Sequence, residues 1–342
     1  MTAAQKPDIS VIIPVHKGGA KFRLCLESVQ KAITLPTEII VVADGETDGS
    51  WRMAEELGIR VISLPETGGP ARARNAGART AKGDILFFVD ADVTIPLDAL
   101  NQIHCSFQSD SGLAAAFGSY DDAPSETNFL SQYKNLLHHY VHQTASEQAS
   151  TFWGACGAIR REIFWAMGGF DETYRHPSIE DIELGYRVRK AGHRIRLLKT
   201  LQIKHLKRWG LISLLKADLF YRAFPWSRLI LREKPMINDL NLKMSHRLSG
   251  ILIWVGVLSA GTAFYTTWAL IVIPGVMITL VGLNWDLYRY LKNKRGLLFA
   301  LRAVPCHWFY YLYSTAAFGL VLAYKQLSKI ASLFRTHTMA VK

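Results

Sequence analysis

Two carboxylates stand directly after a short apolar run. The run Ile85–Val89 predicts a buried strand, and Asp90 and Asp92 follow it with one residue between them. In an extended chain, residues i and i+2 share one face, so both carboxylates are expected to face the same cleft. Mg²⁺ and Mn²⁺ prefer oxygen ligands, often one or two carboxylates together with phosphate oxygens of a substrate. Because this spacing is common by chance, the neighbouring motifs decide whether it marks a metal site.

Short apolar runs alternate with amphipathic stretches through residues 8–200. Alternation of this kind predicts an α/β fold with a mostly parallel sheet covered by helices on both faces. Such sheets bind ligands beyond the carboxyl ends of their strands, where Pro14, Asp44 and the Asp90/Asp92 pair fall. The predicted strands are 9–15, 38–42, 60–64 and 85–89, and the predicted helices are 22–32, 51–57 and 71–80.

Two motifs lie near that edge. Residues 38–50 read EIIVVADGETDGS, and Asp44 follows the strand. Its carboxylate either accepts hydrogen bonds from a nucleoside or forms an ordinary Asp-Gly turn. Residues 68–77 read GGPARARNAG, in which two glycines and a proline open an Arg-rich helix. Helix N-termini favour anions, so Arg74 is a candidate phosphate donor; alternatively, Arg74 and Asn75 link the helix to a neighbouring loop.

Candidates for acid–base chemistry come later in the chain. Residues 179–195 read IEDIELGYRVRKAGHRI and begin a helix, where Glu180 and Asp181 are either helix-dipole partners or a general base at a cleft edge. Downstream, His205 either completes an oxygen-rich metal site or packs at an interface. Small residues form a turn within 151–172, and its Trp153 and Gly154 are candidates for the acceptor side of a site.

Composition limits the class of protein. The chain has 342 residues and a net charge of +12, which is compatible with nucleic acid, an anionic membrane surface or phosphorylated substrates as partners. Its four cysteines are widely separated, which argues against a disulfide framework or zinc ribbon and suits a reducing compartment. The polar N-terminus does not resemble a signal peptide, so the catalytic part is expected in the cytosol.

A long uncharged stretch predicts membrane spans. Residues 251–285 contain no Asp, Glu, Lys or Arg. A single helix of this length would measure roughly 52 Å, against a hydrocarbon core of about 30 Å, so two short spans are expected. The alternative is the helical core of a soluble protein. The predicted spans are 250–266, 268–285 with a kink at Pro274, and 304–324.

Charge predicts how these spans would be oriented. The segment between the second and third spans is basic, which places it in the cytosol together with the catalytic part. The C-terminus would then lie outside; because it is also basic, the third span could instead be re-entrant or interfacial. Residues 199–234 mix aromatic and basic side chains, as expected of helices in the lipid headgroup region; the alternatives are a solvated basic helix or a nucleic-acid patch. The predicted regions are 1–200 (catalytic), 201–248 (interfacial helices), 249–328 (transmembrane) and 329–342 (tail).

The motifs together resemble the GT-A glycosyltransferases of family 2. The resemblance covers roughly residues 8–210 and rests on VIIPV, EIIVVADGETDGS, GGPARARNAG, FVDADV, GGFDE and IEDIELGYRVRKAG, which occur in this order. It implies a Rossmann-like GT-A catalytic domain and a nucleotide-sugar donor, with a UDP-sugar favoured. The tail is similar to tails of bacterial members that act on membrane-bound acceptors.

The resemblance also implies roles for individual residues. Asp181 corresponds to the base that deprotonates the acceptor hydroxyl, and Asp92 to the direct ligand of a Mg²⁺ or Mn²⁺ ion, with His205 as a further ligand. Donor-binding positions are Pro14, Val15, Asp44, Arg74, Asp90, Ala91 and Asp92, and acceptor-side positions are Trp153, Gly154, Glu180, Arg208 and Trp209.

Three departures from the family pattern are present. Ala43 and Asp44 replace the common Asp-Asp pair, which predicts altered nucleobase recognition, and residues 16–18 (His-Lys-Gly) replace the usual Asn-Glu. Arg208 and Trp209 remain from the Gln-x-x-Arg-Trp motif of processive synthases, but His205 stands in place of its Gln. The sequence therefore predicts transfer of a single sugar over polymerisation.

The expected function is that of a metal-dependent, inverting glycosyltransferase in the cytoplasmic (inner) membrane. It would move one sugar to a hydroxyl of a lipid or glycolipid acceptor. The first alternative is transfer to polyprenyl phosphate, and the second is a non-catalytic membrane scaffold of the same fold. No feature of the sequence specifies the sugar or the oligomeric state. Nucleic acid is not expected as a partner, because the bases cluster beside the apolar segments and no nucleic-acid motif is present.

Overall fold

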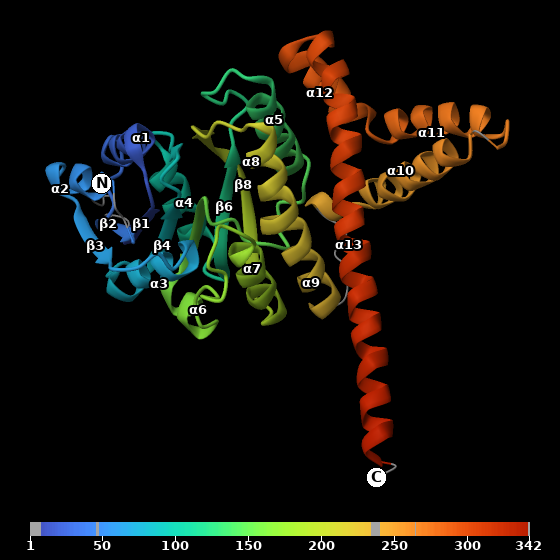
Figure 1. The fold of residues 1–342 in the computed structure, drawn as a ribbon. Helices are drawn as coiled ribbons and strands as arrows, with labels where there is room; N and C mark the ends of the chain where they lie inside the picture. The colour runs from blue at the N-terminus through green and yellow to red at the C-terminus, as the bar shows by residue number, and fades with distance from the viewer. Residues whose placement is uncertain (1–7, 46–47, 234–239, 264, 341–342) are drawn as a thin grey trace. The chain divides into compact units, whose positions relative to one another are not determined.

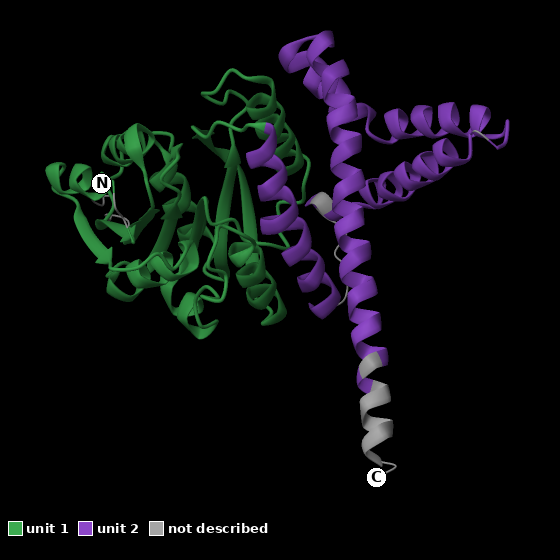
Figure 2. Ribbon diagram, in the orientation of Figure 1, with its two compact units in different colours: residues 1–210 green, residues 211–342 purple. Residues whose placement is uncertain are grey.

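The chain folds into two compact units, residues 1–210 and 211–342 (Figure 2). The computed structural model describes residues 8–45, 48–233, 240–263 and 265–340. Glu46 and Thr47 of the second motif, and the last two residues of the predicted tail 329–342, lie outside the described residues. Each unit is treated separately below.

Unit 1 is built on an eight-stranded sheet with helices around it (Figure 1). The strand order is β3-β2-β1-β4-β7-β6-β8-β5. The strands are β1 Ile9–Val15, β2 Glu38–Asp44, β3 Arg60–Leu64, β4 Ile85–Val89, β5 Val93–Thr94, β6 Leu113–Tyr120, β7 Cys156–Arg160 and β8 Arg194–His205. The helices are α1 Gly19–Gln30, α2 Ser50–Glu56, α3 Pro70–Thr80, α4 Ala99–Ser109, α5 Phe129–Gln143, α6 Arg161–Ala166 and α7 Glu180–Lys190.

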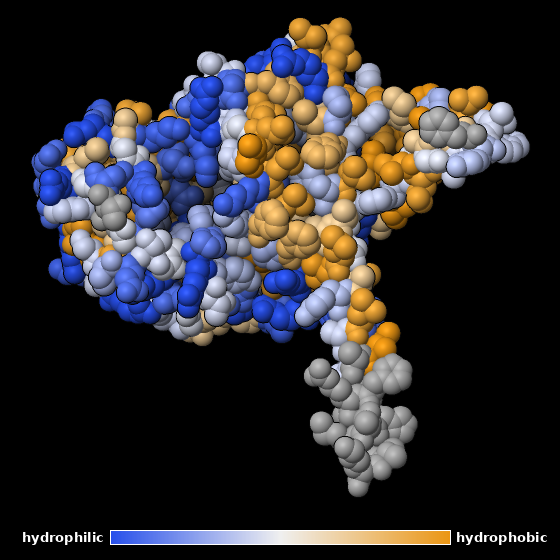
Figure 3. Space-filling view, in the orientation of Figure 1, coloured by the Kyte–Doolittle hydropathy of each residue, from blue (hydrophilic) through white to orange (hydrophobic). Residues whose placement is uncertain are grey.

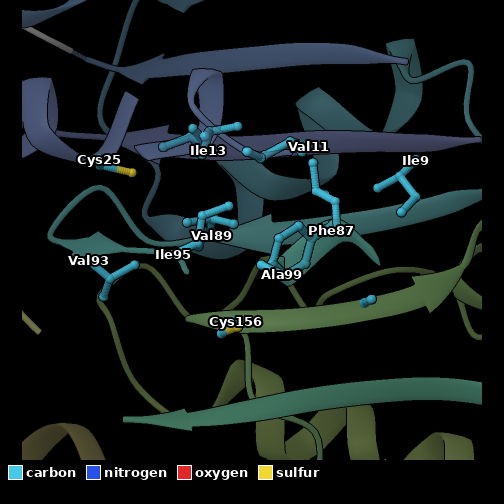
Figure 4. Packing of buried hydrophobic residues seen from close by; sticks show 14 of the residues in the cluster. Ile9, Val11, Ile13, Cys25, Phe87, Val89, Val93, Ile95, Ala99 and Cys156 are labelled. Atoms are coloured by element: carbon cyan, nitrogen blue, oxygen red, sulfur yellow. The ribbon is translucent and has the colours of Figure 1, made fainter. Parts of the chain in front are cut away.

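The first four long strands confirm the predicted α/β pattern. β1 pairs in parallel with β2 and β4, and β2 pairs in parallel with β3. All five residues of β4 are buried, as expected of a central strand covered on both faces. Figure 4 shows Val11, Phe87 and Val89 packed together in this core. The bounds of β1, β3 and β4 are those that the apolar runs predict.

The remaining half of the sheet is mixed, because β7 runs against its neighbours. It pairs antiparallel with β4 on one side and β6 on the other, and Cys156 at its start faces Val89 at the end of β4. The turn before β7, which contains Trp153 and Gly154, therefore lies at the carboxyl edge of β4.

Strand β8 corrects one expected boundary. Residues 201–205 complete this twelve-residue strand, although the predicted region 201–248 places them among interfacial helices. Leu201, Ile203 and His205 are buried while Gln202 and Lys204 between them are half-buried. This period of two belongs to a strand rather than a helix. The basic side chains of the segment conceal it in the sequence.

Unit 2 is helical. α8 Leu211–Lys216, a π-helical segment Ala217–Ala223 and α9 Phe224–Glu233 precede α10 Met244–Thr262, α11 Ala269–Leu283, α12 Trp285–Arg295 and α13 Leu297–Ala340. Hydrophobic side chains gather over these helices (Figure 3), and Ile251, Leu258, Leu270 and Ile278 are among the exposed ones. Among the described residues, no single helix has both the length and the hydrophobicity of a membrane span. α11 and α12 meet both criteria as a pair, with a bend of 67° between them.

We expect Gly69→Ala to destabilise unit 1 by about 1–3 kcal/mol. Gly69 has φ 89° and precedes α3, and an added Cβ would lie 2.5 Å from the carbonyl oxygen of Arg175. Gly58→Ala is the matched control, because Gly58 has φ 70° but nothing within 4 Å of an added Cβ. Denaturant unfolding of both variants separates backbone strain from the clash. Equal losses would show that the approach of Arg175 does not matter.

Candidate active site

The strand ends that the sequence marks meet at one edge of the sheet. Pro14 and Val15 close β1 and lie opposite Val42 and Ala43 of β2. Val15 is buried and Pro14 is half-buried. Ala91 lies between Asp90 and Asp92 in the turn after β4 and is also half-buried. These residues therefore contribute mainly backbone and shape to the edge.

Asp44 fixes the start of α3. Its Oδ1 accepts the N–H of Gly68 and its Oδ2 accepts the N–H of Gly69, both at 2.8 Å, and the residue is 4% exposed. Backbone N–H groups at a helix start are otherwise unsatisfied, so a carboxylate there stabilises the turn. These contacts give Asp44 a structural role at the start of α3 that the sequence did not predict, and its contact with a nucleoside stays a prediction.

Arg74 joins the two acidic motifs. Its Nη2 donates to Asp90 Oδ1 at 2.6 Å and its Nη1 donates to Glu180 Oε1 at 2.8 Å. Arg74 and Glu180 are both buried, whereas the Asp90 side chain is 33% exposed. The second oxygen of Glu180 accepts the N–H of Ser178, so this carboxylate is also committed within the fold. Arg74 thereby holds the turn after β4 against the start of α7.

Asn75 makes a similar link in the neighbouring position. Its side chain donates to the carbonyl oxygen of Phe170 at 2.8 Å and accepts the N–H of the same residue at 2.9 Å. The structural link that the sequence allows for the Arg74-Asn75 pair is therefore present at both residues.

Asp92 approaches a histidine that is far away in sequence. Val93 pairs with His205 in the β5–β8 ladder, and the N–H of Leu206 donates to the carbonyl oxygen of Asp92. This pairing leaves Asp92 Oδ2 and His205 Nε2 3.9 Å apart, with 34% of the Asp92 side chain exposed.

The Asp92–His205 pair lies within reach of one divalent cation. Two ligand atoms that each lie about 2.1 Å from one Mg²⁺ are at most about 4.2 Å apart. The observed 3.9 Å is below that limit but above the roughly 3 Å that separates adjacent octahedral ligands, so the two side chains would shift slightly to share an ion. The Asp92 carboxylate is a ligand type that suits both Mg²⁺ and Mn²⁺. Among the described residues, no group of three or more His, Cys, Asp or Glu side chains is placed to hold an ion. The remaining ligands would have to come from water or a bound substrate.

Asp181 is held at the start of α7. Its Oδ2 accepts the N–H of Gly154 at 2.9 Å, and its Oδ1 accepts the N–H of Ile182 at 2.8 Å. Burial raises the pKa of this carboxyl to about 7, and the charge of Glu180 acts in the same direction. The Gly154 hydrogen bond, Arg74 and the Ile182 hydrogen bond oppose the rise in pKa. A carboxyl with a pKa near neutrality suits a general base.

Comparisons with known proteins identify a family for the sheet-containing unit. Residues 10–168 match the family described as Glycosyl transferase family 2. The chain contains a family 2 glycosyltransferase domain. The match ends at Gly168, so it includes Asp44, Arg74 and Asp92 but stops before Asp181 and His205.

Curated relatives of the glycosyltransferase domain are moderately similar. The succinoglycan biosynthesis protein ExoA of Rhizobium meliloti is 27% identical over 64% of this chain and 67% of its own length. GlyG of Streptococcus pneumoniae is 29% identical over 35% of this chain and 42% of its own. The pre-mycofactocin glycosyltransferase of Mycobacterium tuberculosis is 27% identical over 63% of this chain and 46% of its own length. The chain thus spans less than half the length of the last two.

Solved structures confirm the GT-A fold. The mannosyltransferase PcManGT of Pyrobaculum calidifontis, in complex with GDP-Man and Mn²⁺, matches with a TM-score of 0.59 at 18% identity, covering 88% of this chain and 86% of its own. Residues 1–349 of S. aureus TarS, in complex with UDP-GlcNAc, match with a TM-score of 0.51 at 19% identity, covering 93% and 91%.

Two predicted acceptor residues lie at the end of the glycosyltransferase unit in different settings. Arg208 is 71% exposed and forms an ion pair with Glu126 at 3.6 Å. Trp209 is 5% exposed. Its backbone N–H donates to Ser131 Oγ, and its backbone carbonyl oxygen accepts from the side chain of Asn128. Trp209 therefore anchors the chain to the start of α5.

An aromatic cluster beside Trp153 was not predicted from the sequence. The ring of Tyr120 lies 4.8 Å from Trp153, 4.7 Å from His138 and 4.3 Å from His205, measured between centroids. Tyr120 is the last residue of β6, so it reaches the same edge as Asp92. The available signal was its position at the end of the run LAAAFGSY, but that alanine-rich run is a weak strand signal.

Proposed function

We propose that this protein transfers a single sugar from a nucleotide-sugar donor to a hydroxyl of a membrane-associated lipid or glycolipid acceptor, with inversion at the anomeric carbon. The observation that carries the proposal is the Arg74 bridge. It ties the turn that holds Asp92 to the helix start that holds Asp181. A cation-binding pair and a carboxyl suited to act as a base thus belong to one rigidly connected edge.

The residues of this edge divide the reaction between them. Asp181 takes the proton of the acceptor hydroxyl, whose oxygen forms a bond to the anomeric carbon from the face opposite the leaving group. The bond from that carbon to the diphosphate oxygen breaks, and the nucleoside diphosphate leaves. Asp92 and His205 would hold Mg²⁺ or Mn²⁺, which neutralises charge on the leaving diphosphate. Burial of Asp181 keeps its pKa near the working pH.

The donor is proposed to be a nucleotide sugar, with a UDP-sugar favoured. The named ligands of the structural neighbours support the class, since one binds GDP-Man with Mn²⁺ and another binds UDP-GlcNAc. Asp44 accepts two backbone N–H groups and keeps lone pairs for a further hydrogen bond, so it is proposed to contact the nucleoside from the end of β2.

The acceptor and location rest on unit 2. Its exposed apolar residues and the bent α11–α12 pair support a membrane-embedded tail, with the catalytic unit on the cytosolic side of the inner membrane. Transfer to polyprenyl phosphate is the second candidate, because a basic stretch precedes the apolar helices. A scaffold without activity is disfavoured by the raised pKa of Asp181.

The function is tested with the full chain purified in detergent. UDP-, GDP- and dTDP-sugars are supplied with Mn²⁺ or Mg²⁺, and nucleotide release is measured with and without membrane lipid extract. Metal-dependent release of one nucleotide, increased by the extract, is the expected result. Fractionating the extract into neutral lipids and polyprenyl phosphate distinguishes the two acceptors. Binding of a nucleotide sugar without release from any donor would favour the scaffold.

We expect Asp92→Ala to weaken binding of Mn²⁺ and of the donor together, by about tenfold or more for the metal. The residue supplies one of the two paired ligand atoms, and the diphosphate is bound largely through the ion. Asp84→Ala is the control, because Asp84 lies before the opposite end of β4, 74% exposed, and pairs only with the surface residue Arg161 in a described ion pair. Titration calorimetry with Mn²⁺ and nucleotide would contradict the role of Asp92 if both variants bound like the wild type.

A further inference from the structure

The aromatic ring of Tyr120 lies flat against the ring of His205. The two centroids are 4.3 Å apart and the planes differ by 14°. β6 and β8 run in parallel, and Tyr120 pairs with Ile203, two residues before His205. The stack is therefore a diagonal neighbour contact between adjacent strands, set by the sheet register.

The Tyr120 ring is itself fixed by two other elements. Trp153, in the turn before β7, presents its edge to the ring at 4.8 Å and 90°. His138 of α5 lies 4.7 Å away, and Nδ1 of the next residue, His139, lies 2.7 Å from the carbonyl oxygen of Tyr120. A ring held on several sides has little freedom to change rotamer, so its face is a fixed surface for His205.

The orientation of His205 decides whether it reaches the cation. Its Nε2 is 3.9 Å from Asp92 Oδ2 in the observed rotamer, and rotation of the ring about its Cβ–Cγ bond would carry Nε2 away. Histidines that bind metals depend on neighbouring groups to fix the ring, and removing such groups typically reduces metal affinity about 10–100-fold. The stacked face of Tyr120 is placed to do this.

We propose that Tyr120 is a positioning residue that holds His205 in the orientation needed to share a divalent cation with Asp92. The proposal rests on the metal dependence of the proposed function. It adds a residue that touches neither donor nor cation and acts only through His205. Its effect is on cation affinity, and its effect on turnover follows from that.

The test uses Mn²⁺ binding to the full chain, with nucleoside diphosphate present and no sugar to transfer. Free Mn²⁺ is measured by electron paramagnetic resonance. Tyr120→Ile removes the ring and keeps a strand-favouring side chain, and Tyr120→Phe keeps the ring. We expect Tyr120→Ile to weaken Mn²⁺ binding about tenfold or more and Tyr120→Phe to bind like the wild type. Thermal unfolding without metal shows whether each variant is folded. If Tyr120→Ile does not fold, Tyr120→Met serves as the second variant without an aromatic ring.

A double mutant separates positioning from general damage to the fold. If Tyr120 acts through His205, then adding Tyr120→Ile to His205→Ala causes no further loss of Mn²⁺ affinity. Wild-type affinity in a folded ring-free variant would overturn the proposal, as would an undiminished effect of Tyr120→Ile in the His205→Ala background. In both cases the proposed function would stand. If the wild type binds no Mn²⁺ even with nucleotide, the metal-dependent function fails and this proposal fails with it.

Discussion

Asp181→Asn is expected to abolish sugar transfer and leave the protein folded. The asparagine keeps an oxygen that can accept the Gly154 N–H but cannot take a proton from an acceptor hydroxyl. Loss of a general base costs about 10²–10⁴-fold in rate, so turnover should fall by at least the lower figure. Donor binding should change little, because the proposed role of Asp181 concerns the acceptor hydroxyl.

The measurement is kcat for nucleotide release alongside donor binding by calorimetry. Asp98→Asn is the matched control, since Asp98 is an exposed carboxylate before α4 whose described partner is the side chain of Gln102. It should leave kcat unchanged. Turnover at the wild-type rate in Asp181→Asn would remove this residue from the mechanism.

The same carboxyl gives the reaction its expected pH dependence. Since burial raises the pKa of Asp181 to about 7 and the base acts when deprotonated, kcat/KM should rise with pH through about 7 and then level off. The free energy of unfolding changes in the opposite direction with pH. The folded state favours the protonated form, so the contribution of Asp181 to stability falls as pH rises from its ordinary pKa of 3.8 to about 7. The stability of Asp181→Asn minus that of the wild type should therefore be larger at pH 8 than at pH 5.

Arg74→Ala is expected to cause the largest loss of stability among the single substitutions considered. It leaves the buried carboxylate of Glu180, 5% exposed, and the partly buried Asp90 without their cation. Removing one partner of a buried ion pair costs about 3–5 kcal/mol, because the remaining charge is uncompensated. Activity should be lost as well, since Arg74 connects the turn after β4 to the start of α7.

Arg72→Ala provides the comparison for Arg74→Ala. Arg72 lies two residues earlier on the same helix, is half-buried, and donates to the carbonyl oxygen of Glu66 at 3.4 Å. Its replacement should cost about 0.5 kcal/mol. Denaturant unfolding monitored by tryptophan fluorescence measures both. Similar small losses for the two variants would show that the Arg74 bridge does not stabilise the fold.

The sequence predicts the parallel half of the sheet well because burial dictates its composition. β1 and β4 are buried along almost their whole length, so they read as continuous apolar runs with sharp ends. The other half is harder to predict. β6 is rich in alanine, and β7 reads CGAIR, with Ile159 as its one large apolar residue. β8 carries Arg and Lys on its half-buried face, which resembles the basic segment that follows it.

The sequence predicts which residues belong to the candidate site, but it does not predict which of them contact one another. Asp92 and Asp181 stand at element ends that local patterns mark, whereas Arg74 and Glu180 are 106 positions apart and meet only in the folded chain. The sequence therefore allows Arg74 to be either a phosphate ligand or a structural link. The ion pairs show the structural link, and the contact with phosphate stays a prediction. Tyr120 has only a weak local signal, its place at the end of an alanine-rich run, because its importance comes from the register of β6 against β8.

If residues before β7 contact the acceptor, as proposed, the reversed direction of β7 has a consequence for where variation should alter the choice of acceptor. Had β7 run parallel to β4, the segment preceding it would emerge at the opposite edge, where the N–H of Arg161 donates to the carbonyl oxygen of Asp84. Instead, residues 144–155 emerge beside Asp90 and carry Gly154 to Asp181. Exchange of this segment between relatives should therefore change the accepted substrate, whereas exchange of α6, which starts at the opposite edge directly after β7, should leave it unchanged.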